Sequence, residues 1–453
     1  MDKLDKTQRE LEGSWWELDH EDNPILGKLQ NNDNITLEVI GIEGSSIPML
    51  CHLDSSILKT ILGELSSGKY CTLHECSASL QGFGASGLTN VKYTASSFAE
   101  GIHSQDLNLE KFSSCRLSYD GLGSWMNIKP FKFSTDEDSK KVEYIYPTSK
   151  KIGITSLGIT IEFLYYFDGK TNNNGYVYLE AKPYIEIASV KHRSFVEWLE
   201  ICNDLGMILS IISGQVLACT SFQLKQINFK HNIIHVDEWI SIRSKHAFHM
   251  FQKYDKSAFQ FLISKQSIDS NFDKLINGSF VFVNKNRRIL NNFIETLDHE
   301  IDEKWKFLKL VQLLEKIHRL LCKGKYMENK LYTDMTNKLK SSCDDLVNDT
   351  IKEKFKIILK NGNKCELKDI IYEFISMCWN VCQNDINDPD EFVASVASTR
   401  NSLSHGKETN LVDYFNINAI LKKIIGYILL RQCNFDAEFL VRQFEKLAFP
   451  AFV

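Results

Sequence analysis

Residues 388–406, DPDEFVASVASTRNSLSHG, decide the fold of the C-terminal part of the chain, because they carry signals for both ends of a helix. Asp388 can cap the first turn, Pro389 suits the first helical position, and Glu391 stands three residues after the cap. A mostly apolar stripe for a core recurs at helical spacing: Phe392, Val396, Thr399 and Leu403. Gly406 stands where a left-handed residue would end the helix. The stretch therefore predicts one capped helix with a defined end.

Three polar side chains gather near the end of this predicted helix: Arg400, Asn401 and His405. At about 100° per residue, Asn401 and His405 lie about 40° apart on one face, whereas Arg400 lies about 140° from His405, beside the apolar stripe. An arginine in that position is partly desolvated unless an anion meets it. Arg400 and His405 could converge if the last turn unwinds, or if two copies of the helix pair across a dimer.

The pattern R-N-x-x-x-H followed by glycine, at residues 400–406, resembles the HEPN ribonuclease motif. The resemblance implies RNA cleavage without a metal or other cofactor. It also implies that Arg400 holds the scissile phosphate, that His405 is the general acid/base for attack by the 2′-hydroxyl, and that Asn401 orients the site. Proteins of this kind usually form homodimers in which two motifs face one cleft. A histidine at a helix C-terminus can also serve only as a partner of the helix dipole.

The composition is that of a globular protein of two or three domains: 453 residues, 43% hydrophobic and 25% charged. The net charge of −5 gives no global basic signal, which counts against a protein that coats long nucleic acids but not against an enzyme that binds a few phosphates. There is no signal-peptide pattern and no apolar run of membrane-spanning length, so we expect a cytoplasmic protein without a membrane partner. The twelve cysteines form no CxxC pair, which favours reduced core thiols and no zinc site.

Two parts with different periodicity follow along the chain. Residues 1–190 alternate in the manner of strands, most clearly at 36–43, 70–77 and 152–166, and predict a β-rich domain resembling a sandwich or barrel. By contrast, residues 47–69 predict a short helix or turn. From residue 300 the strand signals stop, and helical spacing recurs in seven segments: 303–324, 327–347, 349–360, 366–383, 389–405, 414–432 and 435–447.

The predicted fold class is therefore α+β, with a β-rich N-terminal domain followed by an all-α helical bundle of HEPN type. The predicted division is 1–190 for the β-rich domain, 191–299 for a mixed continuation or linker, and 300–453 for the helical domain. Within the mixed segment, a helix is expected at 193–213 and a strand at 216–229.

The N-terminal half carries its own family resemblance, in the order of five short pieces. They are GSWW at 13–16, GKL at 27–29, ILGELSSGKYCTLHEC at 61–76, GIH at 101–103, and the pair Leu122 and Trp125. Their order and spacing resemble the N-terminal domain of ApeA, a bacterial anti-phage defence family with a C-terminal HEPN domain. The resemblance implies abortive infection, with a nuclease acting on an RNA such as transfer RNA. The N-terminal domain would sense infection or restrain the nuclease until a phage-derived trigger appears.

Several other patterns favour structural roles. GFGASG at 82–87 matches a dinucleotide fingerprint, but a β-like stretch follows it, so we interpret it as a loop between strands. The pairs His231/His235 and His246/His249 lack the glutamate of a metalloprotease helix. A small basic cluster at 285–288 is typical of a solvated surface. Trp15 and Trp16 are expected in a core or at a sheet edge.

Two other functions compete with the nuclease hypothesis. A non-catalytic HEPN-type RNA-binding or scaffold protein would use the same bundle without cutting. The presence of all three motif residues, Arg400, Asn401 and His405, argues against it. A nucleotide-modifying toxin would need a phosphate-binding loop or a carboxylate cluster, and the sequence carries neither pattern.

Overall fold

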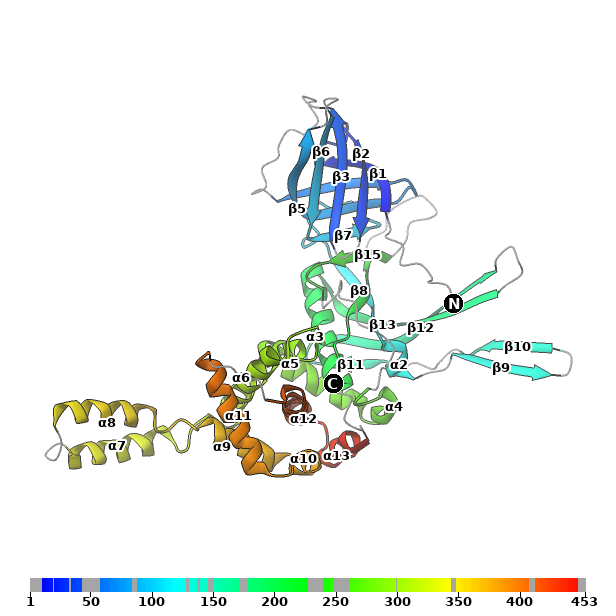
Figure 1. The fold of residues 1–453 in the computed structure, drawn as a ribbon. Coiled ribbons are helices and arrows are strands. Elements are labelled where there is room, and N and C mark those ends of the chain that lie inside the picture. Colours follow the sequence, from blue (N-terminus) through cyan, green and yellow to red (C-terminus); the bar gives the residue numbers. More distant parts are fainter. Residues whose placement is uncertain are drawn as a thin grey trace. The chain divides into compact units, whose positions relative to one another are not determined.

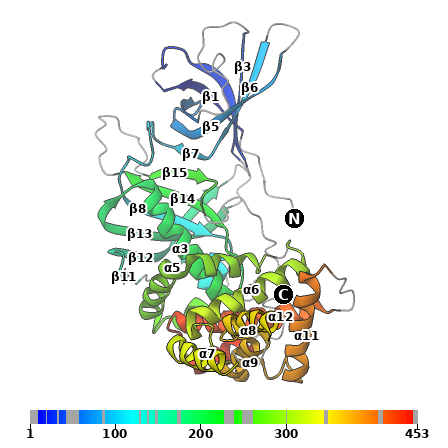
Figure 2. The same ribbon diagram turned by 90° about the vertical axis from the view of Figure 1, so that its left-hand side faces the viewer.

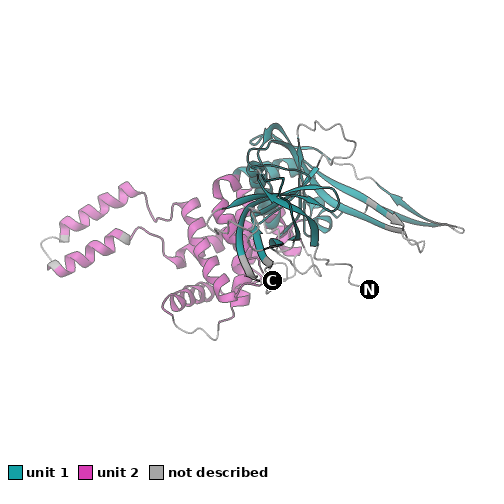
Figure 3. Cartoon of the chain, turned by 90° about the horizontal axis from the view of Figure 1, so that it is seen from above, with its two compact units in different colours: residues 1–210, 217–259, 264–281 teal, residues 211–216, 260–263, 282–453 magenta. Residues whose placement is uncertain are grey.

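A computed structural model of the chain describes residues 10–18, 20–31, 34–42, 58–83, 88–127, 130–136, 139–145, 150–171, 177–226, 239–247, 261–298, 300–343, 348–406 and 412–446. The chain divides into two compact units (Figure 3). Unit 1 is residues 1–210, 217–259 and 264–281, and unit 2 is residues 211–216, 260–263 and 282–453. Unit 1 is rich in strands and unit 2 is helical, which confirms the α+β class. The division at residues 190 and 299 stays a prediction.

The first part of unit 1 is a closed antiparallel barrel of six strands (Figure 1). The strands are β1 (Glu10–Glu17), β2 (Ile25–Asn31), β3 (Ile35–Ile42), β4 (Lys59–Leu65), β5 (Tyr70–Phe83) and β6 (Leu88–Ala95). Their order is β4-β1-β2-β3-β6, and β5 closes the barrel by pairing with both β4 and β6. Of the predicted loop GFGASG, Gly82 and Phe83 are the end of β5 and pair with β6, whereas residues 84–87 are outside the described part of the chain.

The prediction of a helix or turn at 47–69 is wrong for Lys59–Leu65, which is strand β4, whereas residues 66–68 form a turn as predicted. Ile61, Leu62 and Leu65 of this strand are all buried. Because it is buried over most of its length, β4 lacks the alternation of polar and apolar residues that marks a half-exposed strand. Residues 43–57 are outside the described part of the chain.

Trp15 fills the centre of the barrel, and glycines on the neighbouring strands make room for its ring. Its side chain is fully buried. A Cβ atom at Gly63 would lie 2.4 Å from Trp15 Cε3, and one at Gly27 would lie 3.0 Å from Cδ1. Trp16 is also buried and packs edge-on against His103, whose Nε2 lies 2.9 Å from the Gly63 carbonyl oxygen. Trp15 therefore belongs to the barrel core, as predicted, whereas Trp16 is on the opposite face of β1 and is buried against His103.

The rest of unit 1 is an open sheet continuous with the barrel through the pairing of β7 with β5. Its strands are β7 (Ser97–Glu100), β8 (Phe112–Tyr119), β11 (Ile152–Ile154), β12 (Ile159–Thr171), β13 (Val177–Arg193), β14 (Cys219–Gln226) and β15 (Trp239–Ser244). Their order in the sheet is β11-β12-β13-β8-β14-β15-β7. Helix α3 (Phe195–Ser213) packs on β8, where the Tyr119 hydroxyl donates to the Cys202 carbonyl oxygen at 2.6 Å. Smaller elements are α2 (Leu122–Met126), α4 (Lys265–Ile268) and the hairpin of β9 (Phe131–Asp136) and β10 (Ser139–Tyr144).

Unit 2 is a bundle of helices around the buried helix α12 (Tyr414–Gln432) (Figure 2). The others are α6 (Glu303–Cys322), α7 (Asn329–Cys343), α8 (Asp349–Asn361), α9 (Leu367–Met377), α10 (Trp379–Cys382), α11 (Pro389–Ser404) and α13 (Ala437–Lys446). The helix predicted over 366–383 is broken at Cys378, where φ is −124° and ψ is 25°. The mixed segment contains a long helix, α5 (Phe272–Glu295), within which the chain passes from unit 1 to unit 2.

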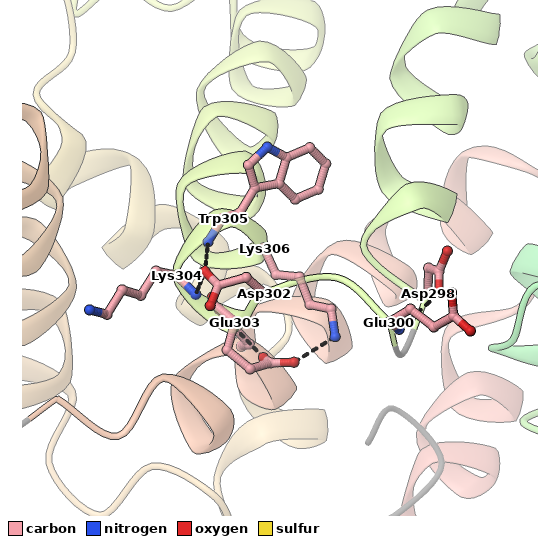
Figure 4. Close-up of polar contacts among 8 residues, drawn as sticks. Asp298, Glu300, Asp302, Glu303, Lys304, Trp305 and Lys306 are labelled. Atoms are coloured by element: carbon pink, nitrogen blue, oxygen red, sulfur yellow. Dashed lines mark hydrogen bonds and ion pairs between the residues drawn. The ribbon is translucent and has the colours of Figure 1, made fainter.

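The beginning of α6 is fixed by polar contacts (Figure 4). Asp302 caps the helix by accepting hydrogen bonds from the backbone N–H groups of Lys304 at 3.0 Å and Trp305 at 3.1 Å. The Glu303 carboxylate accepts from Lys306 Nζ at 2.5 Å and from Asn418 Nδ2 of α12 at 2.7 Å. These contacts join α6 to α12. Among the described helices, none has the length and apolar character needed to cross a bilayer.

Candidate active site

Helix α11 begins as its sequence predicts. The Asp388 side chain accepts hydrogen bonds from the backbone N–H groups of Asp390 at 2.8 Å and Glu391 at 3.2 Å, and Pro389 is the first helical residue. The core face is rotated from the predicted stripe, since Phe392 and Leu403 are only half-buried. Its fully buried residues are Val393, Val396, Ala397 and Thr399.

The other end of α11 stays wound as far as Ser404 and then turns sharply. His405 is the C-cap, and its backbone N–H donates to the carbonyl oxygens of Asn401 at 3.2 Å and Ser402 at 3.1 Å. Gly406 has φ of +67°, the left-handed conformation that its identity predicts. The last turn of α11 is therefore wound in this structure, and Arg400 and His405 keep their separate positions on the helix.

Arg400 lies between an amide and a carboxylate. Its Nη1 donates to Asn401 Oδ1 at 3.4 Å, and its Nη2 lies 3.6 Å from Glu315 Oε1 of α6. The Arg400 side chain remains 39% exposed. Glu315 also forms an ion pair with Arg319, one turn further along α6, at 3.4 Å. An anion therefore meets Arg400, as its position beside the apolar face requires.

Glu315 is the site residue that the sequence did not identify. It lies on a different helix from the motif, in the middle of a stretch whose pattern signals only an amphipathic helix. No local spacing connects it with Arg400. The contact exists because α6 and α11 belong to the same bundle.

His405 and Asn401 are both exposed at the end of α11. Between the described side chains of Arg400 and His405 there is no direct hydrogen bond. Asn401 Oδ1 accepts from the Arg400 guanidinium, whereas the Asn401 carbonyl oxygen accepts only from the His405 backbone N–H. The structure thus presents a guanidinium, an amide and an imidazole at one helix end, all reachable from solvent.

The two histidine pairs that the sequence offers as metal ligands are not part of the site on α11. His231, His235 and His249 lie outside the described part of the chain. His246 follows strand β15 in unit 1, exposed, with its Nε2 3.8 Å from the Glu75 carboxylate. The site on α11 is built from Arg400, Asn401 and His405, with Glu315 as a neighbour.

Comparison with known families covers both units of the chain. Residues 10–277 match the family model described as ApeA N-terminal domain 1, and residues 308–439 match the model described as Apea-like HEPN. The chain belongs to the ApeA family. Its HEPN match includes both α11 and Glu315 of α6, so the Arg-Asn-His motif lies inside the domain of nuclease type. The ApeA assignment makes the chain an anti-phage protein of HEPN nuclease type. Neither a curated protein nor a solved structure matches the chain.

Proposed function

We propose that this ApeA-family protein is a metal-independent endoribonuclease that acts in bacterial abortive infection. The observation that supports the proposal is the end of α11, where the HEPN-type motif places Arg400, Asn401 and His405 at a solvent-accessible position. A guanidinium stays charged and donates to phosphate oxygens, and an imidazole can exchange a proton near neutral pH. These are the two groups that cleavage of an RNA backbone requires when no metal takes part.

The reaction consists of one displacement at phosphorus. His405 as general base accepts the proton of the ribose 2′-hydroxyl, and the O2′–P bond forms while the P–O5′ bond breaks. The leaving 5′-oxygen takes up a proton from a general acid. The products are a 2′,3′-cyclic phosphate and a 5′-hydroxyl. Arg400 stabilises the charge that builds on the phosphate oxygens, and Asn401 keeps the guanidinium in place through its side-chain oxygen.

The active form in this proposal is a homodimer. No hydrogen bond joins the described side chains of Arg400 and His405 within one protomer, and the last turn of α11 is wound. A two-fold axis near the ends of two α11 helices would place Arg400 of one protomer opposite His405 of the other. Two equivalent composite sites would then flank one RNA-binding cleft.

The N-terminal unit has a sensing or restraining role in this proposal. Unit 1 holds a cavity of about 860 Å³, a size typical of ligand sites, with Arg116, Tyr184 and Trp239 in its wall. The Arg116 guanidinium lies 3.9 Å from the centroid of the Trp239 ring. A phage-derived trigger bound there would act on the nuclease from outside the α11 site. The Arg116→Met variant should then lose protection against phage while its purified form keeps the same nuclease activity.

The test of the nuclease is cleavage of total RNA by purified protein in EDTA, with the cut ends mapped. Wild type should leave 2′,3′-cyclic phosphate ends, and His405→Ala should cleave about 10²–10⁴-fold more slowly, the usual weight of a general acid/base. Arg400→Ala should be impaired as well. His246→Ala, which removes an exposed histidine of unit 1, is the matched control.

Three outcomes would contradict the proposal. If His405→Ala cleaves RNA like wild type, His405 has no part in the chemistry. If wild type binds RNA without cutting it, the protein is the non-catalytic RNA-binding alternative. If cleavage needs added Mg²⁺ and leaves 5′-phosphate ends, the reaction is of another class. Mapping the ends on transfer RNA and on other RNAs identifies the substrate.

A further inference from the structure

A second cluster of reactive side chains lies in unit 2, between helices α6 and α9. His318 and Cys322 are one turn apart on α6, and Glu373 faces them from α9. The three ligand atoms lie within 4.8 Å of one another. The His318 Nε2 atom is 2.8 Å from Glu373 Oε2, and the Cys322 thiol donates to Glu373 Oε1 at 3.2 Å. A nitrogen, a sulfur and an oxygen ligand thus converge on one point.

The three side chains differ in how far they are exposed to solvent. His318 is 1% exposed, whereas Glu373 lies at the surface and Cys322 is partly exposed. His318 Nδ1 is buried without a hydrogen-bond partner, whereas Nε2 is the ring nitrogen that faces Glu373. An ion could therefore enter from solvent past Glu373 and Cys322 and meet the imidazole at Nε2.

Cys322 is more exposed to solvent than most of the other described cysteines. Among the described cysteines only Cys322 and Cys365 are not fully buried. Burial, the hydrogen bond to Glu373 and the charges of Glu373 and Cys365 raise the pKa of the Cys322 thiol to about 11. The Cys365 backbone N–H donates to the Gly324 carbonyl oxygen at 3.3 Å. A cation binds the thiolate form, so its binding would release the proton of the Cys322 thiol.

We propose that His318, Cys322 and Glu373 bind a divalent cation of the zinc class. Zinc accepts imidazole nitrogen, thiolate and carboxylate at about 2.0–2.3 Å, which places tetrahedral ligand atoms about 3.3–3.8 Å apart. The observed separations need only small side-chain rotations to reach that geometry. Calcium and magnesium prefer all-oxygen sites, so the thiolate selects against them. Because Glu373 is exposed and Cys322 is partly exposed, a water molecule can supply the fourth ligand.

The position of the cluster indicates a structural role. It lies where the hairpin of α7 and α8 leaves the bundle after α6 and returns before α9 (Figures 1 and 3). The two chains of this neck are joined by the bridge between Lys325 and Lys364, and the Tyr326 backbone N–H donates to the Asn363 carbonyl oxygen at 3.2 Å. A cation held by Cys322 and Glu373 would fasten α6 to α9 at the same neck. It would take no part in the reaction at α11, and the proposal does not rest on the nuclease.

The experiment measures metal in the full-length protein purified without chelator, by mass spectrometry and by exchange with Co²⁺. We expect about one zinc ion per chain and, after exchange, a thiolate-to-cobalt charge-transfer band. Cys322→Ser should abolish the band and lower the zinc content at least several-fold, and Glu373→Gln should lower zinc affinity. Glu366→Gln, at the exposed N-terminus of α9, should leave both readouts unchanged.

Two results would overturn the site. One is wild-type protein that takes up neither zinc nor cobalt. The other is Cys322→Ser protein that binds both as wild type does. Metal content should also be measured in Arg400→Ala and His405→Ala, which should retain zinc. A protein that binds zinc but does not cut RNA would leave this site standing and remove the nuclease proposal, so the two failures are distinguishable.

Discussion

The Arg400 guanidinium lies 3.6 Å from the Glu315 carboxylate, so the cation proposed to hold a phosphate is already held by an anion of its own chain. The Glu315 side chain is 23% exposed and that of Arg400 39%, which makes this a partly solvated ion pair. Such pairs contribute about 0–1 kcal/mol to stability. The contact is therefore weak enough for an RNA phosphate to displace it, and Glu315 can guide Arg400 without blocking it.

The first prediction concerns removal of this carboxylate. Glu315→Gln should raise the affinity for RNA about 2–5-fold, because the phosphate no longer competes with an ion pair worth up to about 1 kcal/mol. The melting temperature should change little for the same reason. The measurement is RNA binding at two salt concentrations in the His405→Ala background, where cleavage does not interfere. Glu353→Gln, which removes an exposed ion-paired carboxylate on α8, is the matched control. Equal or weaker binding by Glu315→Gln would show that Glu315 does not compete with the substrate.

The second prediction concerns the sharing of a site between two protomers. If each site combines Arg400 of one protomer with His405 of the other, mixing Arg400→Ala with His405→Ala subunits restores one complete site in every mixed dimer. Random mixing makes half of the dimers mixed, so activity should return to about a quarter of wild type from two inactive parents. The measurement is RNA cleavage after the two variants are unfolded and refolded together.

The control for this experiment is each variant refolded alone, which should stay inactive. Should the mixture also stay inactive although mixed dimers form, both residues must act within one protomer. The composite site would then be wrong, and α11 would have to change conformation on binding RNA.

The contrast between α11 and its partner Glu315 explains how far the sequence could predict this protein. Asp388, Pro389 and Gly406 act on neighbouring backbone, so both ends of the helix could be predicted from the residues alone. Glu315 could not, because its contact with Arg400 depends on how two helices pack. The same holds for His318 and Cys322, whose helical spacing is visible in the sequence but whose third partner, Glu373, comes from another helix.

Errors in the predicted elements have a similar cause. Strand β4 (Lys59–Leu65) is buried over most of its length in a closed barrel and lacks an exposed face to give it alternation. The break between α9 and α10 at Cys378 has no proline or glycine to announce it. In both cases tertiary packing decides the local structure, and a short window of sequence does not contain that information.

The third prediction concerns the barrel core. A Cβ atom at Gly63 would lie 2.4 Å from Trp15 Cε3, so Gly63→Ala should force the indole to move and destabilise unit 1 by about 1–3 kcal/mol. The measurement is thermal unfolding followed by tryptophan fluorescence. Gly153→Ala is the matched control, because it is also a strand glycine but has open space around its Cβ position. Trp15→Phe in the Gly63→Ala background should recover part of the loss, and full additivity of the two changes would contradict the clash.

The fourth prediction concerns a buried lysine in unit 2. Burial, with a smaller effect of the nearby Lys306 charge, lowers the pKa of Lys422 from its usual range to about 8, although the Glu303 carboxylate acts in the opposite direction. In the unfolded chain a lysine titrates near pH 10.4, so between about pH 8 and 10 the unfolded state binds more protons than the folded state. The free energy of unfolding should therefore rise with pH across this window, by about 1–3 kcal/mol from this residue. Below about pH 8 both states are protonated and the penalty is fully present.

Lys422→Met removes the buried charge and keeps most of the side-chain volume. It should flatten the rise in the free energy of unfolding of unit 2 between pH 8 and 10, because the group that titrates in this window is gone. The measurement is urea unfolding at a series of pH values, with wild type and variant compared at each. Lys304→Met, which removes an exposed lysine at the start of α6, should keep the wild-type pH dependence. A Lys422→Met protein with an unchanged pH profile would contradict the prediction. It would mean that the folded state does not disfavour the charged form of Lys422.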